Sequence, residues 1–370
     1  MKTQAAVLFG PGQDWEIVEL DLDPPKAGEV LLRVEYNGLC HSDEHVRKGA
    51  FLRFPVAGGH EGAGVIEQVG PGVTTVSPGD HVVTSFAPRC GTCPWCMTGR
   101  AFLCDKGAAA SSGELLDGTF RLHYGNVDVG AMCMLGTFSQ WVVVPEGSVV
   151  KIDDDLPLDV ACLLACGVPT GWGSAVNVAQ VGPGDVVVIY GTGGVGMNAV
   201  QGSALAGART IVAVDPVPWK LERAKAFGAH HTFTSHEQAM EFLTEHTRGV
   251  LADKAIIVVG NVEAGVVAQA VEAVSKAGTV VLTGMSDPTE VPTIQLHGTF
   301  MAVYAKRLLT TLYGHCNPHV DIPRLAKLYR TGQLKLDELI TARYALADVN
   351  QGYRDLLAGE NLRGIIEFEH

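Results

Sequence analysis

The chain has 370 residues, with 27 Lys and Arg against 40 Asp and Glu and a formal net charge of −13. This charge argues against a nucleic-acid partner, because phosphates need a basic face, and no stretch approaches the ~18 apolar residues of a membrane-spanning helix. The length exceeds the roughly 250–300 residues that one hydrophobic core serves. We therefore expect two domains, neither a signal peptide nor a membrane anchor, and a cytoplasmic location.

The N-terminal part, up to about residue 150, consists of short β-prone runs separated by Gly and Pro. Examples are 30–36 (VLLRVEY), 64–69 (GVIEQV), 81–85 (HVVTS) and 140–144 (QWVVV). Runs of this length and composition, bounded by turn residues, are typical of strands. The sequence therefore predicts a mainly β first domain.

Cysteine and histidine residues lie in three separate segments of the chain. They are 40–45 (CHSDEH) after a strand, 58–62 (GGHEG) before the next strand, and 165–167 (ACG). Each segment alone is ordinary, since buried cysteines and turn histidines are common. Together they suggest one Cys–His–Cys set with a fourth position left to water or substrate, as a catalytic zinc requires.

Nine cysteines in an acidic chain without a leader favour reduced thiols over disulfides. Four of them, Cys90, Cys93, Cys96 and Cys104, form a C-x2-C-x2-C-x7-C motif in a loop rich in Gly and Pro. The two-residue gaps let thiolates converge on one tetrahedral ion, and four sulfur ligands leave no position for substrate. We expect a structural zinc; an iron–sulfur cluster is the competing interpretation. The following segment, 105–136, lacks strong periodicity, and we expect a functional loop or lid there.

The second half of the chain alternates apolar strands with helical patterns. The predicted strands are 186–190, 210–214, 255–259 and 279–283, and the first predicted helices are 195–207 and 219–227. Continuous apolar strands separated by helices indicate a parallel sheet that is buried on both faces. Further on, 323–329 and 347–357 have helical patterns, and 364–368 is a short strand whose partner we expect in the first domain.

A glycine-rich loop joins the first of these strands to its helix. The loop reads Gly191-Thr192-Gly193-Gly194-Val195-Gly196, and the next strand ends at Asp215. Between a strand and a helix, such glycines allow a pyrophosphate to rest on the helix N-terminus. A carboxylate at the end of the second strand accepts hydrogen bonds from ribose hydroxyls and repels a 2′-phosphate, so NAD(H) is favoured over NADP(H). The alternative is a loop whose glycines serve packing alone.

With these motifs in this order, the chain resembles the zinc-dependent medium-chain alcohol dehydrogenases over nearly its whole length. The resemblance rests on CHSDEH at 40–45, GHEGAG at 59–64, the four-cysteine motif, ACGVPTGWG at 165–173 and GTGGVG at 191–196. It implies an α/β fold with a catalytic, mainly β GroES-like domain and a Rossmann doubly wound sheet. The corresponding expected boundaries are 1–166 with 315–370 for the catalytic domain and 167–314 for the NAD-binding domain.

The resemblance also implies the metal ligands. Cys40, His60 and Cys166 would bind the catalytic zinc, and the four-cysteine motif would bind the structural zinc. Glu61 would lie close to the catalytic zinc as a nearby carboxylate. Asp43 would orient His60, a partner that metal-bound histidines generally require.

Two further residues would move the substrate proton. Ser42 would take the proton of the alcohol, whose pKa zinc lowers as it lowers that of bound water. His45 would relay the proton towards solvent, which suits an imidazole with a pKa near ~6.5. The alcohol carbon would then give a hydride to the nicotinamide.

The resemblance assigns cofactor and substrate contacts as well. His41 and Arg363 match positions that contact the cofactor pyrophosphate, and Thr170 and Val195 would flank the nicotinamide. The full set expected to bind NAD(H) is His41, Thr170, Gly191, Gly193, Gly194, Val195, Gly196, Asp215, Lys220 and Arg363. The expected substrate pocket is formed by Phe51, Phe86 and Met285, although Phe86 fits core packing almost equally well. Cys133, Cys162 and Cys316 receive no role.

Within the family, the segments 128–141 and 317–344 are similar to an actinobacterial branch that is assayed with an artificial nitroso electron acceptor. In that branch the cofactor is so tightly bound that it is reduced and reoxidised in place, which defines a nicotinoprotein. The alternative enzyme is a formaldehyde dehydrogenase that depends on glutathione or mycothiol, with Arg89, Arg100, Lys106 and Arg121 as cations for its anionic substrate. A non-catalytic relative or a zinc-free quinone reductase is less compatible with the intact metal motifs. The family further suggests a homodimer or homotetramer, and small alcohols or aldehydes as partners.

Overall fold

The computed structural model describes residues 1–50, 53–287 and 293–370. The chain forms two compact units. Unit 1 comprises Met1–Cys166 and Asn317–His370, and unit 2 comprises Gly167–Cys316. The boundary expected from the sequence at 314/315 lies two residues before the end of unit 2.

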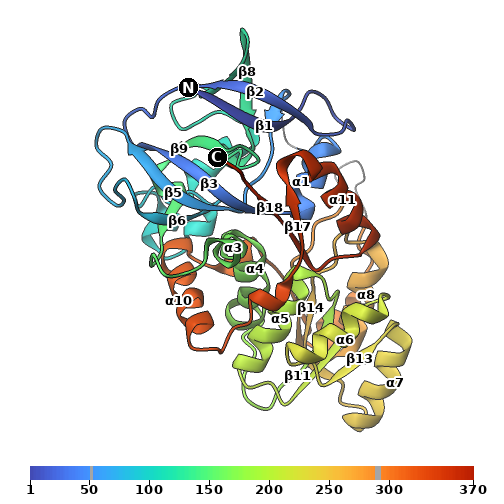
Figure 1. Ribbon diagram of the computed structural model, residues 1–370. Coiled ribbons are helices and arrows are strands. Elements are labelled where there is room, and N and C mark those ends of the chain that lie inside the picture. The colour runs from blue at the N-terminus through green and yellow to red at the C-terminus, as the bar shows by residue number, and fades with distance from the viewer. Residues whose placement is uncertain (51–52, 288–292) are drawn as a thin grey trace. The chain divides into compact units, whose positions relative to one another are not determined.

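Unit 1 is mainly β and contains two strand systems (Figure 1). A closed barrel has the strand order β1-β2-β7-β8-β4, and a second sheet has the order β10-β6-β5-β3-β18-β17, with β9 also paired to β3. Its strands are β1 Lys2–Leu8, β2 Glu16–Leu22, β3 Glu29–Gly38, β4 Val56–Ala57, β5 Gly62–Val69, β6 His81–Thr84, β7 Leu122–Tyr124, β8 Val127–Ala131, β9 Trp141–Pro145, β10 Val149–Lys151, β17 Ile340–Ala345 and β18 Arg363–Glu367.

Strand β3 is the centre of the second sheet. Its residues Val30, Leu32 and Val34 are fully buried in one cluster, as expected for alternate positions that share a face of a strand. The C-terminal strand β18 pairs with β3 in antiparallel orientation, from Ile365 opposite Gly38 onward. The prediction that the last strand joins the first domain is therefore confirmed, and this pairing carries the C-terminal segment to the strand that precedes Cys40.

The helices of unit 1 are short except in its C-terminal segment. Helix α10 contains the predicted helical stretch 323–329. Helix α11 contains the predicted stretch 347–357 except for the first two residues of that stretch. On α11, the buried residues Val349, Gly352, Tyr353 and Leu356 recur at helical spacing, so one face of the helix packs into the core. The helices are α1 His41–Arg47, α2 Pro94–Met97, α3 Leu158–Ala161, α10 Pro318–Arg330 and α11 Val349–Ala358.

The sequence predicted a loop without regular structure over 105–136. This prediction is wrong for the second half of the segment. Strands β7 and β8 form an antiparallel hairpin there, and β8 pairs in parallel with β4 within the barrel. The strands were missed because β7 has three residues and β8 has five, too few for an alternating pattern to emerge. Before them, Asp105–Ser111 is a 3-10 helix.

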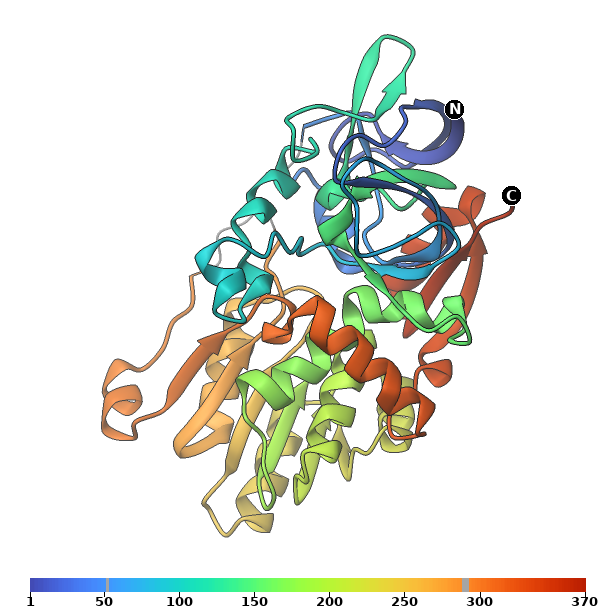
Figure 2. The ribbon, with the colours of Figure 1, turned by 90° about the vertical axis from the view of Figure 1, so that its left-hand side faces the viewer.

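Unit 2 is a six-stranded parallel sheet in the order β13-β12-β11-β14-β15-β16, seen in Figure 2 as neighbouring arrows coloured green to orange. The order reverses direction at β11, which is the arrangement of a Rossmann fold. Its elements are α4 Gly167–Gly173, β11 Val186–Tyr190, α5 Gly194–Leu205, β12 Thr210–Val214, α6 Pro218–Ala226, β13 His231–Phe233, α7 His236–His246, β14 Ala252–Ile257, α8 Ala264–Ala273, β15 Val274–Leu282, α9 Gly298–Val303 and β16 Arg307–Thr310.

The inner strands β11 and β12 of this sheet are apolar on both faces because helices cover both. Every residue of β11 and β12 is buried. Helices α7 and α8 pack on one face, with Leu243 and Val267 in the same cluster as Val188. Right-handed crossovers place α5 and α6 on the opposite face. The predicted doubly wound parallel sheet is confirmed.

Within the described ranges, no single helix has the length and apolar character needed to cross a membrane. One bent pair of helical segments, Leu158–Ala165 and Gly167–Val178, meets that requirement jointly, by length and composition alone.

Candidate metal and nucleotide sites

Cys40, His60, Glu61 and Cys166, all in unit 1, form a buried cluster. One ligand atom from each residue lies within 4.8 Å of the others. Cys40 is the N-cap of α1, His60 and Glu61 precede β5, and Cys166 ends the first segment of the unit. The fold thus brings together the three residues expected to bind the catalytic zinc and the carboxylate expected beside them.

The chemistry of this cluster fits a divalent cation. Two thiols, an imidazole and a carboxylate are the ligand types of zinc. His60 Nε2 and Glu61 Oε1 are buried and have no hydrogen-bond partner among the described residues, so both can serve as ligand atoms. Hydrogen bonding to Cys166, followed by the charge of His60, holds the pKa of the Cys40 thiol well below its ordinary value despite burial. A thiolate is the form of cysteine that binds metal.

Asp43 connects the first helix to the histidine of the cluster. Its Oδ1 lies 3.2 Å from His60 Nδ1 and accepts a hydrogen bond from the Gly59 backbone N–H at 3.1 Å. Gly59 has a φ of +87°, a conformation that glycine adopts without steric cost. His60 therefore presents Nδ1 to the carboxylate and leaves Nε2 for the metal, which is the arrangement expected for a metal-bound histidine.

Arg363, which the resemblance assigns to the cofactor pyrophosphate, forms a buried ion pair with Glu61 through Nη2 and Oε2. Gly38 leaves the space for this pair, because a Cβ at that position would collide with Glu61 Oε2. The sequence did not indicate the pair, since its members lie 302 residues apart. The only local signal is a glycine at the end of a strand, which often marks a close approach.

Helix α1 carries the residues expected to move the proton. Ser42 is half-buried, and its Oγ lies 3.6 Å from Cys40 Sγ. His45 is buried one turn further along the helix, and His41 is half-buried at its start. A helix places residues three positions apart on neighbouring parts of its surface, so Ser42 and His45 are suitably arranged for a proton relay.

Of the expected substrate-pocket residues, Phe86 lies beside the cluster. Its ring is 6.0 Å from that of His60, edge to face, and it also packs against the core of unit 1. Phe86 therefore packs against the core beside His60, and its place in the substrate pocket stays a prediction. Phe51 lies outside the described residues, and Met285 belongs to unit 2, where its side chain is exposed.

Cys133, which the sequence left without a role, also lies near the cluster. Burial raises the pKa of its thiol to about 11, and the charges of His60, Asp43 and Cys40 act on it. Cys133 and Met134 both have positive φ values, 57° and 61°. Neither feature has a signature in the sequence.

The four-cysteine motif forms a second cluster, again with its sulfur atoms within 4.8 Å of one another. Cys93 caps α2, and the backbone N–H groups of Cys93 and Cys96 point at Cys90 Sγ and Cys93 Sγ at 3.3 and 3.5 Å. Cys90 Sγ and Cys96 Sγ are 3.9 Å apart. Zn–S bonds of ~2.3 Å in a tetrahedron separate sulfurs by about 3.8 Å, so the spacing fits one zinc ion rather than an iron–sulfur cluster.

In unit 2, the glycine loop has the geometry that a pyrophosphate needs. Gly191 has a φ of +98°, and a Cβ on Gly196 would collide with the Gly191 carbonyl. Gly193 caps α5, whose first residues are Gly194 and Val195. The loop therefore approaches closely and leaves the N-terminus of α5 accessible to an anion.

Asp215 follows β12 and is buried beside this loop. Its Oδ2 accepts from the Thr192 backbone N–H at 2.7 Å and its Oδ1 from the Val217 backbone N–H at 2.9 Å. Each oxygen keeps a lone pair for a ribose hydroxyl. Lys220, in the first turn of α6, is half-buried, and burial lowers its pKa while the charge of Asp215 opposes the change.

The residues expected to flank the nicotinamide lie on adjacent helices of unit 2. Thr170 belongs to α4 and Val195 to α5. A Cβ on Gly171 would collide with the Val195 carbonyl, so the two helices are in close contact. The fold thus brings Thr170 and Val195 to one place.

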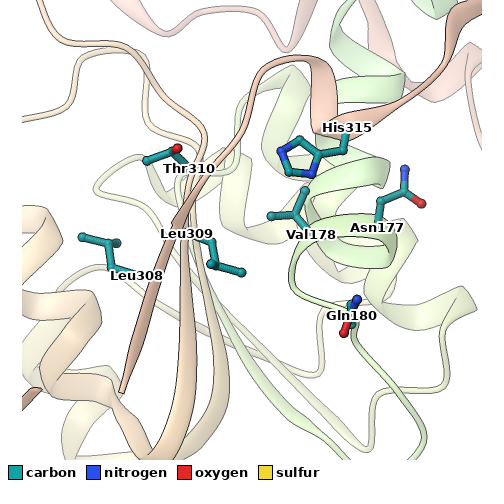
Figure 3. Close-up of a pocket in the computed structure, with 7 residues that line it drawn as sticks. All are labelled: Asn177, Val178, Gln180, Leu308, Leu309, Thr310 and His315. Atoms are coloured by element: carbon teal, nitrogen blue, oxygen red, sulfur yellow. The ribbon is translucent and has the colours of Figure 1, made fainter. Parts of the chain in front are cut away.

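Unit 2 also has a cavity of about 440 Å³ on the side of edge strand β16 (Figure 3). It contains no residue that the sequence assigned to metal, cofactor or substrate. Its lining residues are Asn177, Val178, Gln180, Leu308, Leu309, Thr310 and His315.

Comparison with known proteins identifies a family that matches both units of the chain. Residues 26–154 match the family model described as the alcohol dehydrogenase GroES-like domain, and residues 194–328 match that of the zinc-binding dehydrogenases. The chain is 53% identical over 367 residues to the NDMA-dependent alcohol dehydrogenase of Amycolatopsis methanolica, covering 99% of each protein. It is 44% identical over 371 residues to alcohol dehydrogenase B of Mycobacterium tuberculosis, covering 100% of this chain and 99% of that protein.

Solved structures agree with this result. The crystal structure of benzyl alcohol dehydrogenase from Acinetobacter calcoaceticus superimposes with a TM-score of 0.92 at 31% identity, covering 100% of both chains. An α/β fold with a GroES-like β domain and a Rossmann-type sheet is thus common to both. The chain belongs to the family of zinc-binding alcohol dehydrogenases.

Proposed function

We propose that the chain catalyses the reversible oxidation of a primary alcohol to an aldehyde, with NAD(H) as hydride carrier. The observation that carries this proposal is the buried set of Cys40, His60 and Cys166, with Glu61 beside it. Three protein ligands from this set leave one coordination position for the substrate oxygen. A zinc ion bound there would lower the pKa of the alcohol hydroxyl.

The residues of α1 provide the route for the proton. The alcohol gives its hydroxyl proton to Ser42, whose own proton passes to His45 and on to solvent. NAD⁺, which the glycine loop and Asp215 would hold, would supply the acceptor for the hydride of the alcohol carbon, so that alcohol and NAD⁺ would give aldehyde, NADH and a proton. The 3.6 Å between Ser42 Oγ and Cys40 Sγ supports this role, because it places the hydroxyl at the cluster.

The nucleotide is proposed to be NAD(H) rather than NADP(H). Asp215 is buried at the end of β12, where an adenosine ribose lies in a Rossmann fold. An additional 2′-phosphate would meet this carboxylate at close range and in a poorly solvated environment. His41, Thr170, Val195, Lys220 and Arg363 complete the proposed cofactor contacts, together with the loop glycines.

We further infer that the cofactor is tightly bound, as in the nitroso-acceptor branch. The 53% identity to a relative named NDMA-dependent supports this. The thiol-dependent formaldehyde dehydrogenase has less support, because S-(hydroxymethyl)glutathione dehydrogenase of Komagataella pastoris is 35% identical. In addition, Arg121, one of the cations considered for an anionic substrate, is buried in ion pairs with Glu29 and Asp117.

Location and assembly follow from the same proposal. Thiolate ligands for two zinc ions require a reducing compartment, which favours the cytoplasm. Strand β16 ends the sheet of unit 2 and exposes Leu309, and Leu312, two residues beyond the strand, is exposed as well. An open apolar edge of this kind supports association of two copies into a dimer, or of two dimers into a tetramer.

Metal analysis combined with one substitution tests the proposed site. Wild-type protein is expected to contain two zinc ions per chain, and Cys40→Ala one, with alcohol oxidation reduced by at least about 1,000-fold because the substrate oxygen loses its metal. Folding is checked by circular dichroism. A single zinc in the wild type, or full activity in Cys40→Ala, would refute the proposal.

A further inference from the structure

Asp43 has an unmet requirement for hydrogen bonds. The residue is fully buried, and both of its identified contacts, to Gly59 and His60, involve Oδ1. Oδ2 is buried without a hydrogen-bond partner in the described part of the chain. Because a carboxylate removed from water needs donors at both oxygens, a neighbouring group should supply one at Oδ2.

Tyr353 on α11 is a neighbour that has a donor available. Its side chain is 3% exposed, and within the described ranges its hydroxyl is also buried without a partner. Burial, followed by the charge of Asp43, raises the pKa of Tyr353 well above its ordinary value. The phenol therefore remains protonated at physiological pH and keeps a proton to donate.

The ring of Tyr353 is held in place by two other aromatic rings. It stacks on Trp15 at 6.3 Å between centroids and meets the edge of Phe138 at 6.2 Å. Asn350, one turn earlier on α11, accepts from the Trp15 backbone N–H and donates to the Trp15 carbonyl, both at 2.9 Å. The phenol is thus fixed relative to the helix that carries it.

The segment that carries His60 packs on the same rings. A Cβ on Gly58 would collide with the Trp15 ring and lie 2.7 Å from Phe138 Cδ2. The next residue, Gly59, donates its N–H to Asp43. Aromatic packing and hydrogen bonds therefore link α11 to the backbone of the metal-binding segment.

We propose that Tyr353 is a positioning residue for the catalytic zinc: its hydroxyl donates to Asp43 Oδ2, so that Asp43 holds the imidazole of His60 with Nε2 directed at the metal. The proposal satisfies two buried polar atoms with a single hydrogen bond. It rests on the zinc site proposed above. It places Tyr353 behind Asp43, which in turn lies behind the ligand His60. Outer partners of this kind typically change metal affinity by about 10–100-fold.

The test is zinc release from Tyr353→Phe, which deletes only the hydroxyl. The two-zinc holoenzyme is mixed with a chromogenic chelator, and the release phase that is missing in Cys40→Ala is assigned to the catalytic site. This phase is expected to be about 10–100-fold faster in Tyr353→Phe, with release from the four-cysteine site unchanged. Tyr344→Phe is the matched control, since the Tyr344 hydroxyl also bonds a carboxylate, Asp355, on α11; it should release both zinc ions at wild-type rates.

A double-mutant cycle excludes a general effect on folding. If the hydroxyl acts through the carboxylate, Tyr353→Phe should add little to the release rate in an Asp43→Asn background. Wild-type release from Tyr353→Phe, equal acceleration at both sites, or full additivity with Asp43→Asn would overturn the inference. If wild-type protein holds two zinc ions and Tyr353→Phe behaves normally, only this inference fails; one zinc in the wild type overturns it together with the proposed function.

Discussion

At the scale of single residues, the balance of charge around the metal cluster is the central feature of unit 1. Cys40, Glu61 and Asp43 are negative groups in a region closed to water, and Arg363 is buried with them. Burial lowers the pKa of the Arg363 guanidinium, which the negative groups oppose, and the side chain remains a cation. Arg363 therefore stabilises Glu61 as a carboxylate beside the cluster.

This ion pair leads to a prediction about stability. Arg363→Met leaves Glu61 buried without its partner, and breaking a buried pair in this way costs about 3–5 kcal/mol. For a unit of this size the cost corresponds to a decrease of roughly 6–20 °C in thermal midpoint, measured by calorimetry on zinc-loaded protein. Arg354→Met, an exposed arginine on α11 that contacts Gln351, should change the midpoint by less than about 2 °C. Equal midpoints for the two variants would show that the pair contributes nothing to stability.

At the scale of elements, the four-cysteine loop is built differently from the catalytic cluster. Three of its ligands lie within seven residues, and α2 within it has four residues, too few for a helix that is stable alone. Backbone N–H groups of Cys93 and Cys96 point at the Cys90 and Cys93 sulfurs. We therefore expect the loop to depend on its metal for its structure, as small zinc-binding segments do.

Removal of one ligand tests that dependence. Cys104→Ala should reduce the zinc content from two ions to one and open the loop to trypsin after Arg100 and Lys106, which are exposed at its end. The products are identified by mass spectrometry. Cys162→Ala, a fully buried cysteine outside both clusters, should keep two zinc ions and resist cleavage. Two zinc ions in Cys104→Ala would contradict a role for this loop as a metal site.

At the scale of the whole molecule, the two units divide the chemistry between them. Unit 1 contains both metal clusters, and unit 2 contains the glycine loop and Asp215. Full-length similarity to a relative named NDMA-dependent supports retention of the cofactor between turnovers. A retained cofactor must be reoxidised in place, so turnover then requires a second substrate that accepts its hydride.

Cofactor retention is tested on protein purified without added nucleotide. Denaturation is expected to release about one NAD(H) per chain, quantified by chromatography, and alcohol oxidation should depend on a nitroso acceptor and not on free NAD⁺. Cys40→Ala should release the same amount although it is inactive, because the glycine loop and Asp215 are intact. Absence of nicotinamide together with full turnover on free NAD⁺ would contradict tight binding.

What the sequence determined on its own is local. Three features were predicted from the sequence: the four-cysteine spacing, the glycine loop between a strand and a helix, and the apolar strands of unit 2. Each involves residues that are close together in the sequence, so its geometry follows from residue spacing and periodicity. The alternation of strand and helix in unit 2 and four of its strands could be predicted as well, whereas the three- and five-residue strands of the β7–β8 hairpin could not.

Only the tertiary structure decided which distant side chains meet. Pairing of β18 with β3 carries Arg363 to Glu61 across 302 residues, and packing of α11 on Trp15 and Phe138 carries Tyr353 to the rings on which the Gly58–Gly59 segment also packs. No periodicity encodes such contacts, because they depend on the registration of elements and on glycines, such as Gly38, that leave space for side chains from elsewhere. The expected ligands of the catalytic zinc and Asp43 behind His60 could thus be recognised as motifs, while the Arg363–Glu61 pair became visible only in the folded chain.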